Sequence, residues 1–366
     1  MEIGIIGLPK SGKTTLFNAL TRGKAETAAY AAAGPTPNLG MAKVPDSRLQ
    51  ALAAMFQPKR TIQAEVRYVD IAAPPRGSGK GDGLSGQFLA HLSGVDALIH
   101  VVRAFEDESI PHIEGSIDPE RDIAVIDLEL AFSDLAIIAR RLERLTDSLK
   151  GARSPEREAL GGEQALLARI RADLEKEVPV CQQGLSADES RAIVNYQFLT
   201  AKPQLVVLNL SEEQLPQAAS YEAELHARYH RPQLEIAALC AKLEMELAQL
   251  SDAEAEELGS AWGLKEPGLE RIIGLSYRLL GLISFFTTAS GEVKAWTIAK
   301  GATALKAAGK IHSDMEKGFI RAEVVAYDEL AKCGSLAEAR RRGLLRLEGK
   351  SYTVQDGDVI TFLFNV

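Results

Sequence analysis

The stretch Gly7-Leu8-Pro9-Lys10-Ser11-Gly12-Lys13-Thr14 decides the fold that we expect for this chain. It fits the pattern G-x-x-x-x-G-K-[ST], and it stands between a short apolar run, Ile3–Ile6, and a helical segment, Thr15–Leu20. In that setting the glycines let backbone N–H groups turn inward around phosphate oxygens, and the helix directs its positive end toward them. The stretch therefore predicts a phosphate-binding loop in which Lys13 contacts the β- and γ-phosphates and the Thr14 hydroxyl binds Mg²⁺.

Four further apolar runs have the length and composition of buried β-strands. They are Val66–Ile71, Ala97–Val102, Leu205–Asn209 and Leu234–Leu239. Helical segments separate them, which is typical of βαβ units and a largely parallel sheet. Asp70 comes near the end of the first run. An acidic residue there is the usual second Mg²⁺ group of a phosphate-loop protein, although it can also be a simple turn cap.

Two later parts of the chain differ in pattern from the sheet. Leucine and isoleucine recur at helical spacing on both sides of a break at 151–155, which predicts an antiparallel helical hairpin over residues 130–198. The Ser186-x-x-Glu189 capping box is expected to start the returning helix. After about residue 286, turn residues separate short strand-like runs, which predicts a small α+β domain. Those runs are Val293–Ile298, Ile320–Val325, Ser351–Val354 and Val359–Phe364.

Composition limits the classes of protein that this chain can belong to. Of its 366 residues, 46% are hydrophobic and 25% charged, which excludes extensive disorder. The net charge of −8 argues against a protein that coats nucleic acid with its whole surface, although the last 80 residues carry a small positive charge. The three cysteines are far apart and form no disulfide framework, so a reducing, cytoplasmic setting is expected. No apolar run is long enough to cross a membrane, and no membrane partner is expected.

Motifs along nearly the whole chain resemble those of the YchF-type, Obg-related P-loop ATPases. The matching segments are Thr14–Leu20, Pro37–Asn38, Val44–Leu49, Asp70–Ala72, Lys80–Leu84, His100–Phe105, Phe198–Pro203, Ala295–Ile298, Ala308–Ala322 and Asp356–Val366. The resemblance implies an α/β, G-domain-like P-loop NTPase sheet with an inserted antiparallel coiled-coil hairpin and a small C-terminal α+β, β-grasp-like TGS domain. The expected domains are a split nucleotide-binding domain (1–129 and 199–285), the hairpin (130–198) and the TGS domain (286–366).

The same resemblance implies an activity and partners. It implies slow, Mg²⁺-dependent hydrolysis of ATP, with GTP also accepted. It further implies contact with the ribosome or RNA through the hairpin and the TGS domain, whereas no DNA partner is expected. Two alternatives stay open: a nucleotide-gated ribosome- or RNA-binding adaptor with little or no hydrolysis, and a GTPase that prefers GTP.

The base-binding segments depart from those of guanine-specific relatives. The strand end reads Asn209-Leu210-Ser211-Glu212 where those relatives have Asn-Lys-x-Asp, and Cys240-Ala241-Lys242 would flank the base. The missing lysine and the longer carboxylate are expected to loosen guanine selection. Asn209 could instead be a helix cap. The resemblance implies that the nucleotide contacts Gly7, Leu8, Pro9, Lys10, Ser11, Gly12, Lys13, Thr14, Thr15, Ala73, Asn209, Leu210, Glu212, Cys240 and Ala241.

The two switch segments depart from the family pattern as well. Gly34 stands where the family has a threonine that closes over Mg²⁺, and the nearby Thr36 is out of register for that role. The second switch motif ends in Ala73, whose N–H can still reach a γ-phosphate. Pro74 and Pro75 follow it and restrict the backbone. These departures motivate the adaptor alternative and favour slow turnover in an enzyme.

Lys10 occupies a phosphate-loop position at which the family usually has asparagine. Its ammonium could supply a built-in positive charge at the bridge between the β- and γ-phosphates, which makes it a candidate catalytic residue beside Lys13. The alternative is a solvated lysine that points away. His100 is expected to be a hydrogen-bonded core histidine or a switch-side histidine, and Arg340–Arg342 either a contact to RNA or a solvated face.

Overall fold

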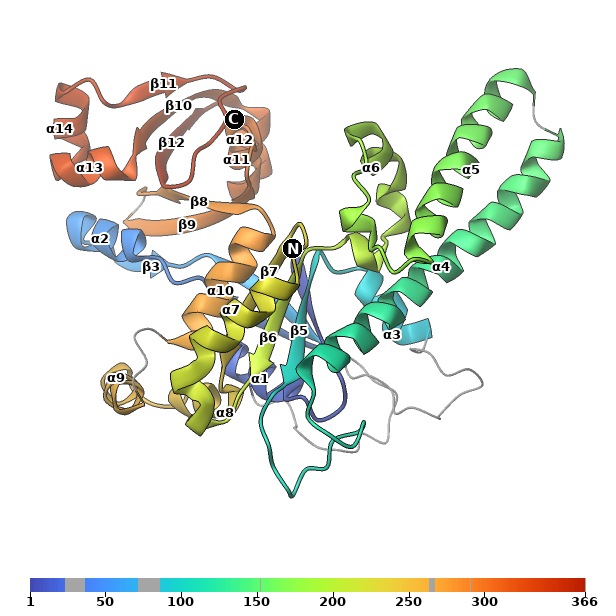
Figure 1. Ribbon diagram of the computed structural model, residues 1–366. Coiled ribbons are helices and arrows are strands. Elements are labelled where there is room, and N and C mark those ends of the chain that lie inside the picture. The colour runs from blue at the N-terminus through green and yellow to red at the C-terminus, as the bar shows by residue number, and fades with distance from the viewer. Residues whose placement is uncertain (24–36, 72–85, 152, 263–266, 290, 366) are drawn as a thin grey trace. The chain divides into compact units, whose positions relative to one another are not determined.

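The computed structural model describes residues 1–366 except 24–36, 72–85, 152, 263–266, 290 and 366 (Figure 1). The chain divides into two compact units. The first consists of Met1–Gly40 and Arg67–Leu269, and the second of Met41–Val66 and Glu270–Val366. None of the described helices is both long enough and apolar enough to span a membrane.

The first unit is built on a sheet with the strand order β2-β4-β1-β5-β6-β7. Its strands are β1 (Glu2–Ile6), β2 (Asn38–Lys43), β4 (Glu65–Asp70), β5 (Ala97–Arg103), β6 (Gln204–Asn209) and β7 (Leu234–Leu239). The pairs from β4 through β1, β5 and β6 to β7 are all parallel, and the four predicted strands are confirmed. Every residue of β5 is buried, because helices cover both faces of a parallel sheet.

The parallel order places the carboxyl ends of these strands at one edge of the sheet. The phosphate loop follows β1 there, Asp70 ends β4, Asn209 ends β6, and Cys240 follows β7. The helices of this unit that follow the strands are α1 (Lys13–Thr21), α3 (Gly86–Ser93), η4 (Glu212–Gln217), α7 (Ala218–Arg228), α8 (Ala241–Leu247) and α9 (Asp252–Ala261). Residues from the two ends of this part of the chain, Gly7 and Cys240, therefore meet at one edge.

A long helical hairpin interrupts the sheet between β5 and β6, as predicted (Figure 1). Helix α4 (Pro119–Gly151) and helix α5 (Ser154–Leu174) pack through the buried side chains of Ile138, Leu145, Leu167, Ile170 and Leu174. Short helices η1 (Val180–Gln182), α6 (Ala187–Ile193), η2 (Val194–Tyr196) and η3 (Leu199–Ala201) lead back to the sheet. The capping box at Ser186 is present, but the prediction that it starts the returning helix is wrong. It starts α6, because Pro155 already favours a helix start at Ser154.

Asp134 fastens the base of the hairpin to the sheet. It is fully buried on α4 and accepts hydrogen bonds from the N–H groups of Leu199 (2.8 Å) and Thr200 (2.9 Å) and from the Thr200 hydroxyl (2.7 Å). Burial raises the pKa of this carboxyl to about 6, although the three hydrogen bonds oppose the rise. Helix α4 is thereby tied directly to η3, the segment that precedes β6.

We expect Asp134→Asn to lower the free energy of unfolding by about 2–4 kcal/mol, because an amide NH₂ would face one of the three donors. The native carboxyl takes up a proton near pH 6 and the unfolded one near pH 3.8, so the wild type gains stability from this group as the pH falls. The difference between the two proteins, measured by urea unfolding, should therefore widen from pH 7 to pH 5. Asp147→Asn, at an exposed position of the same helix, is the control and should change little. A difference that does not vary with pH would contradict the raised pKa.

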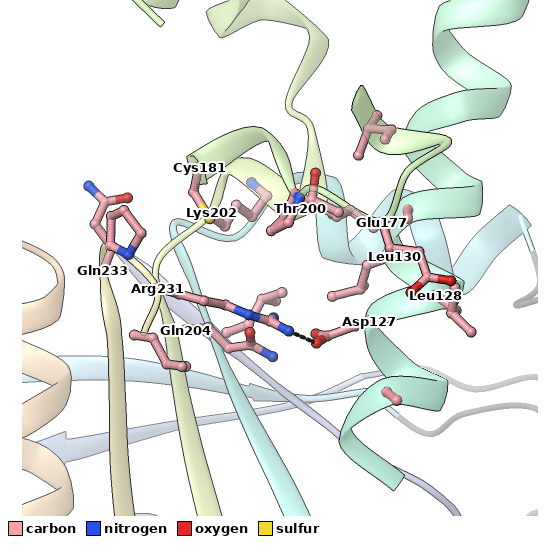
Figure 2. A pocket seen from close by; sticks show the side chains of 18 residues that line it. Asp127, Leu128, Leu130, Glu177, Cys181, Thr200, Lys202, Gln204, Arg231 and Gln233 are labelled. Atoms are coloured by element: carbon pink, nitrogen blue, oxygen red, sulfur yellow. Dashed lines mark ion pairs between the residues drawn. The ribbon is translucent and has the colours of Figure 1, made fainter. Parts of the chain in front are cut away.

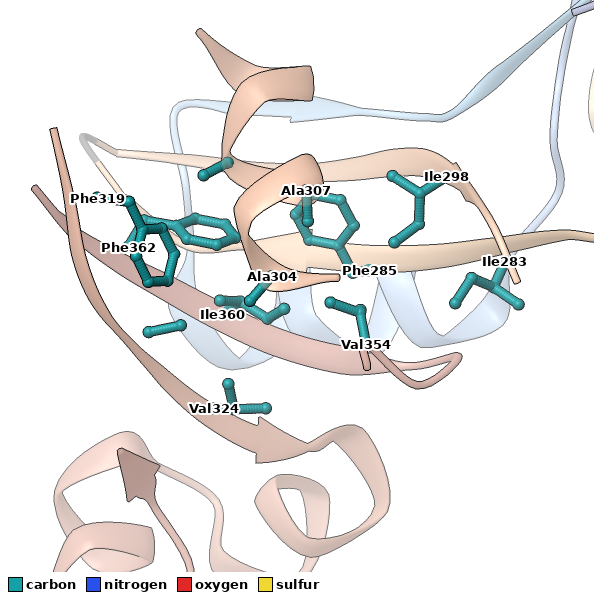
Figure 3. Close-up of a cluster of buried hydrophobic side chains, with 12 residues drawn as sticks. Ile283, Phe285, Ile298, Ala304, Ala307, Phe319, Val324, Val354, Ile360 and Phe362 are labelled. Carbon is teal, nitrogen blue, oxygen red and sulfur yellow. The ribbon is translucent and has the colours of Figure 1, made fainter. Parts of the chain in front are cut away.

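The second unit has a mixed sheet with the order β11-β10-β12-β8-β9-β3. Its strands are β3 (Arg60–Ile62), β8 (Leu282–Thr287), β9 (Glu292–Ala299), β10 (Phe319–Ala326), β11 (Arg346–Glu348) and β12 (Asp358–Phe364). Helices α2 (Ser47–Phe56), α11 (Ala304–Ile311), α12 (Ser313–Lys317), α13 (Tyr327–Cys333) and α14 (Leu336–Arg341) accompany it, and α10 (Gly268–Leu279) precedes β8. Ala304 and Ala307 let α11 pack closely on Phe285, Ile360 and Phe362 of the sheet (Figure 3).

Three of the four predicted strands of the tail are present, and the strand predicted at Ser351–Val354 is wrong. There Thr353 makes only an isolated bridge to Thr303, since turns on both sides leave no room for a ladder. The boundary expected at residue 286 falls inside β8, which pairs with β9 in the tail sheet. The prediction did not include β8 and β11.

Residues 41–66, which we assigned to the split nucleotide-binding domain, cluster instead with the tail. Strand β3 pairs in parallel with β9. The Arg48 guanidinium donates to the carboxylates of Asp46 (2.8 Å) and Asp356 (2.7 Å). The hairpin likewise extends beyond its expected bounds, because α4 begins at Pro119 rather than near residue 130.

Candidate functional site

The phosphate loop turns tightly between β1 and α1. Gly7 has a φ of 147°, and a Cβ atom there would lie 2.3 Å from the carbonyl oxygen of Val101. Gly12, the N-cap of α1, has a φ of 97°. Both positions require glycine, which explains why the loop follows the sequence pattern so closely. Lys10 also has a positive φ, 65°, and its side chain is exposed.

Lys13 is held as a cation inside this loop. Its ammonium donates hydrogen bonds to the carbonyl oxygens of Gly7 (3.0 Å) and Leu8 (2.9 Å), and only 9% of the residue is exposed. Burial lowers the pKa of the ammonium from 10.5 to about 8, while the nearby Asp70 carboxylate raises it. An anionic phosphate is the ligand that would best stabilise such a partly desolvated charge.

Thr14 and Asp70 lie together beside Lys13, as the sequence predicts for a Mg²⁺ site. The Thr14 hydroxyl donates to Oδ2 of Asp70 at 2.9 Å. Oδ1 of Asp70 is buried and has no hydrogen-bond partner among the described residues, and neither has Oγ of Ser11. A carboxylate and a hydroxyl with free oxygen positions suit a hard divalent cation such as Mg²⁺, which takes few protein ligands and completes its shell with phosphate and water.

Asn209 joins the phosphate loop to the second base-binding segment. Its Nδ2 donates to the carbonyl oxygen of Ser11 (2.9 Å), and its Oδ1 accepts from the N–H of Ala241 (3.0 Å). Asn209 does not cap the helix that follows it, η4, whose N-cap is Ser211; its Oδ1 instead binds the first N–H group of α8. Both polar atoms of the Asn209 amide are therefore hydrogen-bonded, one to the phosphate loop and one to the segment that begins α8. The sequence predicts that both of these segments contact the nucleotide.

The remaining base-side residues are close to these two segments. Leu210 is buried and its N–H donates to Leu239, and Cys240 is a buried N-cap whose thiol pKa is raised by burial. The Glu212 carboxylate pairs with the ammonium of Lys242 at 3.1 Å. The predicted contacts did not include Lys242, although it is the third residue of the flanking Cys-Ala-Lys segment. Pro9 and Thr15 are half-buried in the loop and in the first turn of α1.

Several predicted features fall outside these contacts. Gly34, Thr36, Ala73, Pro74 and Pro75 lie outside the described residues. His100 is buried in β5, but the expectation of a hydrogen-bonded histidine is wrong for the part of the chain that is described, since neither ring nitrogen has a partner there. The apolar surroundings of this central strand lower the pKa of His100 to about 3, so its ring is neutral. The arginines Arg340–Arg342 each pair with a surface glutamate, Glu323 or Glu338.

A glycine-dependent loop between a parallel strand and a helix, with a buried lysine and an adjoining Thr–Asp pair, defines a P-loop nucleotide-binding protein. Residues 2–131 match the family model described as "50S ribosome-binding GTPase". Residues 282–365 match the model YchF-GTPase_C, described as "Protein of unknown function (DUF933)". Together with full-length relatives, these matches show that the chain belongs to the YchF family.

The relatives cover the chain from end to end. It is 42% identical to the "Ribosome-binding ATPase YchF" of Bacillus subtilis (strain 168) over 368 residues, 100% of both chains. It is 43% identical to the protein of the same name from Haemophilus ducreyi, over 100% of this chain and 99% of the relative. The solved structure of the Schizosaccharomyces pombe YchF GTPase superposes with a TM-score of 0.87 at 33% identity, and covers 99% of this chain and 97% of that one. The predicted family and fold class are confirmed.

Proposed function

We propose that this chain is a P-loop nucleoside triphosphatase that prefers ATP, also accepts GTP and acts on or near the ribosome in the cytoplasm. The observation that carries the proposal is the Lys13 ammonium, held inside the loop at 3.0 and 2.9 Å from two carbonyl oxygens and beside the Thr14–Asp70 pair. The names of the full-length relatives, ribosome-binding ATPases, support the reaction and the partner. The helical hairpin and the tail domain are the proposed contacts to the ribosome or RNA.

Different residues have different proposed roles in phosphoryl transfer. Lys13 and the backbone N–H groups from Lys10 to Thr15 bind the phosphates and stabilise the charge that develops on the γ-phosphoryl group. Thr14 and Asp70 would hold Mg²⁺, which neutralises charge on the phosphate oxygens. The Ala73 N–H is the proposed further donor to the γ-phosphate. Turnover is expected to be slow, because the switch segments depart from the family pattern at Gly34 and Ala73.

The base side is the proposed source of the preference for ATP. Asn209 positions the Ser11 and Ala241 backbones around the ligand, and Leu210, Glu212 and Cys240 complete the base contacts. A carboxylate paired with Lys242 is a poor acceptor for the two N–H donors of guanine, whereas adenine does not need it.

Calorimetric titration with ATP and GTP tests the base preference. We expect the wild type to bind ATP more tightly than GTP. Glu212→Asp should move the ratio toward GTP by about tenfold, because the shorter carboxylate recedes from Lys242 and restores the acid that reads guanine. Glu213→Asp, at the exposed neighbouring position, is the control and should leave the ratio unchanged. Tighter binding of GTP than of ATP by the wild type would contradict the proposal.

Phosphate release in a single-turnover assay separates an enzyme from an adaptor. We expect measurable release with a saturating excess of protein over ATP. Tight ATP binding with almost no release would instead favour the nucleotide-gated adaptor, which the departures at Gly34, Ala73 and Pro74-Pro75 motivate.

Lys10 is proposed to bring a positive charge to the β–γ bridge. Hydrolysis by the wild type should then be equal in K⁺ and Na⁺, whereas Lys10→Asn should be about tenfold slower and respond to the cation. This loss is far below the 10³–10⁵ of an arginine finger, because a lysine side chain is flexible. Asparagine tolerates the positive φ of this position, so the loop is retained. An identical cation response in both proteins would exclude this role for Lys10.

A further inference from the structure

A cavity lies in the first unit at the edge of the sheet opposite the phosphate loop. Leu98, Gln204 and Leu234 line it from the amino-terminal starts of β5, β6 and β7, while Asp70 and Asn209 stand at carboxyl ends. Helix α4, the end of α5 and the turn at η1 close its other sides, as Figure 2 shows. Its volume is about 140 Å³. The cavity is therefore separate from the proposed nucleotide site.

One wall of the cavity carries hydrogen-bond donors that lack a full set of acceptors within the described residues. Arg231 reaches across to Asp127 on α4 and pairs with it at 2.5 Å, with Gln204 next to the pair (Figure 2). Among the described residues, Asp127 is the only ion-pair partner of this guanidinium, which has five N–H groups. The guanidinium carbon lies 5.3 Å from the centroid of the Tyr229 ring. The Nε2 atom of Gln204 is buried and has no partner among the described residues. A buried amide donor such as this one normally has an acceptor, whereas the Arg231 side chain is 20% exposed.

The rest of the lining fixes the charge and polarity of a suitable ligand. Its charged groups, Asp127, Glu177, Lys202 and Arg231, balance to zero. The Lys202 ammonium already donates to the carbonyl oxygens of Ser93 and Val95, so it is not free to attract an anion. Most other lining side chains are leucine, alanine and proline: Leu98, Ala124, Leu128, Leu130, Ala131, Leu174, Pro179, Leu199, Pro232 and Leu234. A net charge on the ligand would be left without a counter-charge in these surroundings.

We propose that this cavity is a second ligand site, which binds an uncharged molecule the size of one aromatic ring with a carbonyl or amide oxygen. The oxygen would accept hydrogen bonds from Arg231 and Gln204, and the ring would lie against the leucine side chains. The volume suits such a molecule, because a cavity of about 150 Å³ holds benzene. The inference does not depend on the proposed hydrolysis, since no residue of the phosphate loop takes part.

The thiol of Cys181, in the wall of the cavity, reports occupancy directly. Benzamide is the probe, with benzoate and benzamidine as its anionic and cationic counterparts. We expect benzamide to slow the alkylation of Cys181 by iodoacetamide in the full-length protein in a saturable way, as quantified by peptide mass spectrometry. Cys333, in the second unit, is the internal reference and should react at an unchanged rate. Benzoate and benzamidine should protect Cys181 far less.

Two variants connect the protection to the cavity. Gln204→Leu removes the free donor and should weaken benzamide binding about fivefold to tenfold. Ala131→Phe fills the cavity and should abolish the protection. Gln164→Leu, on α5 outside the cavity, is the matched control and should bind like the wild type. Absence of saturable protection would overturn the proposal and indicate a cavity that holds only water. Equal protection by benzoate would contradict the proposed selection for an uncharged ligand, and unchanged binding by Gln204→Leu would contradict the proposed role of the Gln204 amide.

Discussion

Replacement of Lys13 by methionine is expected to lower the rate of phosphate release by about 10³-fold. The variant keeps the length and the apolar stem of the side chain but lacks the cation that faces the β- and γ-phosphates. Single-turnover release with ATP measures the effect. Lys150→Met removes an exposed lysine at the tip of the hairpin and is the control for a general loss of charge. Retention of more than about a tenth of the wild-type rate would remove Lys13 from the proposed mechanism.

The same substitution should stabilise the protein in the absence of nucleotide by about 2 kcal/mol, because it removes a desolvated charge. The native pKa of Lys13 is depressed to about 8 from 10.5, so the cost of the buried charge is fully present below pH 8 and disappears as the pH rises to 10.5. Urea unfolding of both proteins from pH 7 to pH 10 should therefore show their difference shrinking. A difference of constant size would contradict the depressed pKa.

The second large effect is expected for Gly12→Ala. A Cβ atom at this position would lie 2.2 Å from Nδ2 of Asn209, and the φ of 97° is strained for any residue with a side chain. The amide of Asn209 would have to leave its contacts with Ser11 and Ala241, which disturbs both segments of the proposed nucleotide site. We expect ATP affinity, measured by calorimetry, to fall by at least about 10²-fold.

A matched glycine separates the clash from the backbone strain. Gly301 has a similar φ of 86°, but nothing lies within 4 Å of a Cβ atom placed there. Gly301→Ala should cost about 1 kcal/mol of stability and leave ATP affinity unchanged. If Gly12→Ala bound ATP as well as Gly301→Ala does, the contact between the loop and Asn209 would be irrelevant to binding.

Features with a local signature were predictable from the sequence. The buried strands show as apolar runs, and the phosphate loop as glycines at positions that the backbone requires, so the core of the first unit was foreseen. Pairings between distant segments were not. Strand β3 has only three residues, and its partner strand is β9. Arg48 is hydrogen-bonded to Asp356, which lies more than 300 positions away in sequence. These contacts explain why residues 41–66 cluster with the tail rather than with the sheet of the first unit.

The candidate site divides in the same way. The loop pattern and the position of an acid at a strand end predict that Thr14 and Asp70 lie close together. The two side chains are hydrogen-bonded in the structure. The engagement of Asn209 at both ends of its amide and the pairing of Glu212 with Lys242 depend on how two loops meet in space. The cavity beside Arg231 has no sequence signature, because its lining comes from α4, the end of α5, the segment from Pro179 to Gln204 and the turn into β7.

Strand β6 connects the base of the hairpin with the loops of the proposed nucleotide site. Before the strand begins, the Asp134 carboxylate on α4 accepts hydrogen bonds from Leu199 and Thr200. At the end of the strand, the Asn209 amide is hydrogen-bonded to both adjoining loops. Helix α4 of the hairpin is 33 residues long, whereas β6, which links these two sets of contacts, has only six residues. The contacts of Asp134 with the base of the hairpin and those of Asn209 with the phosphate loop therefore lie at opposite ends of the same strand.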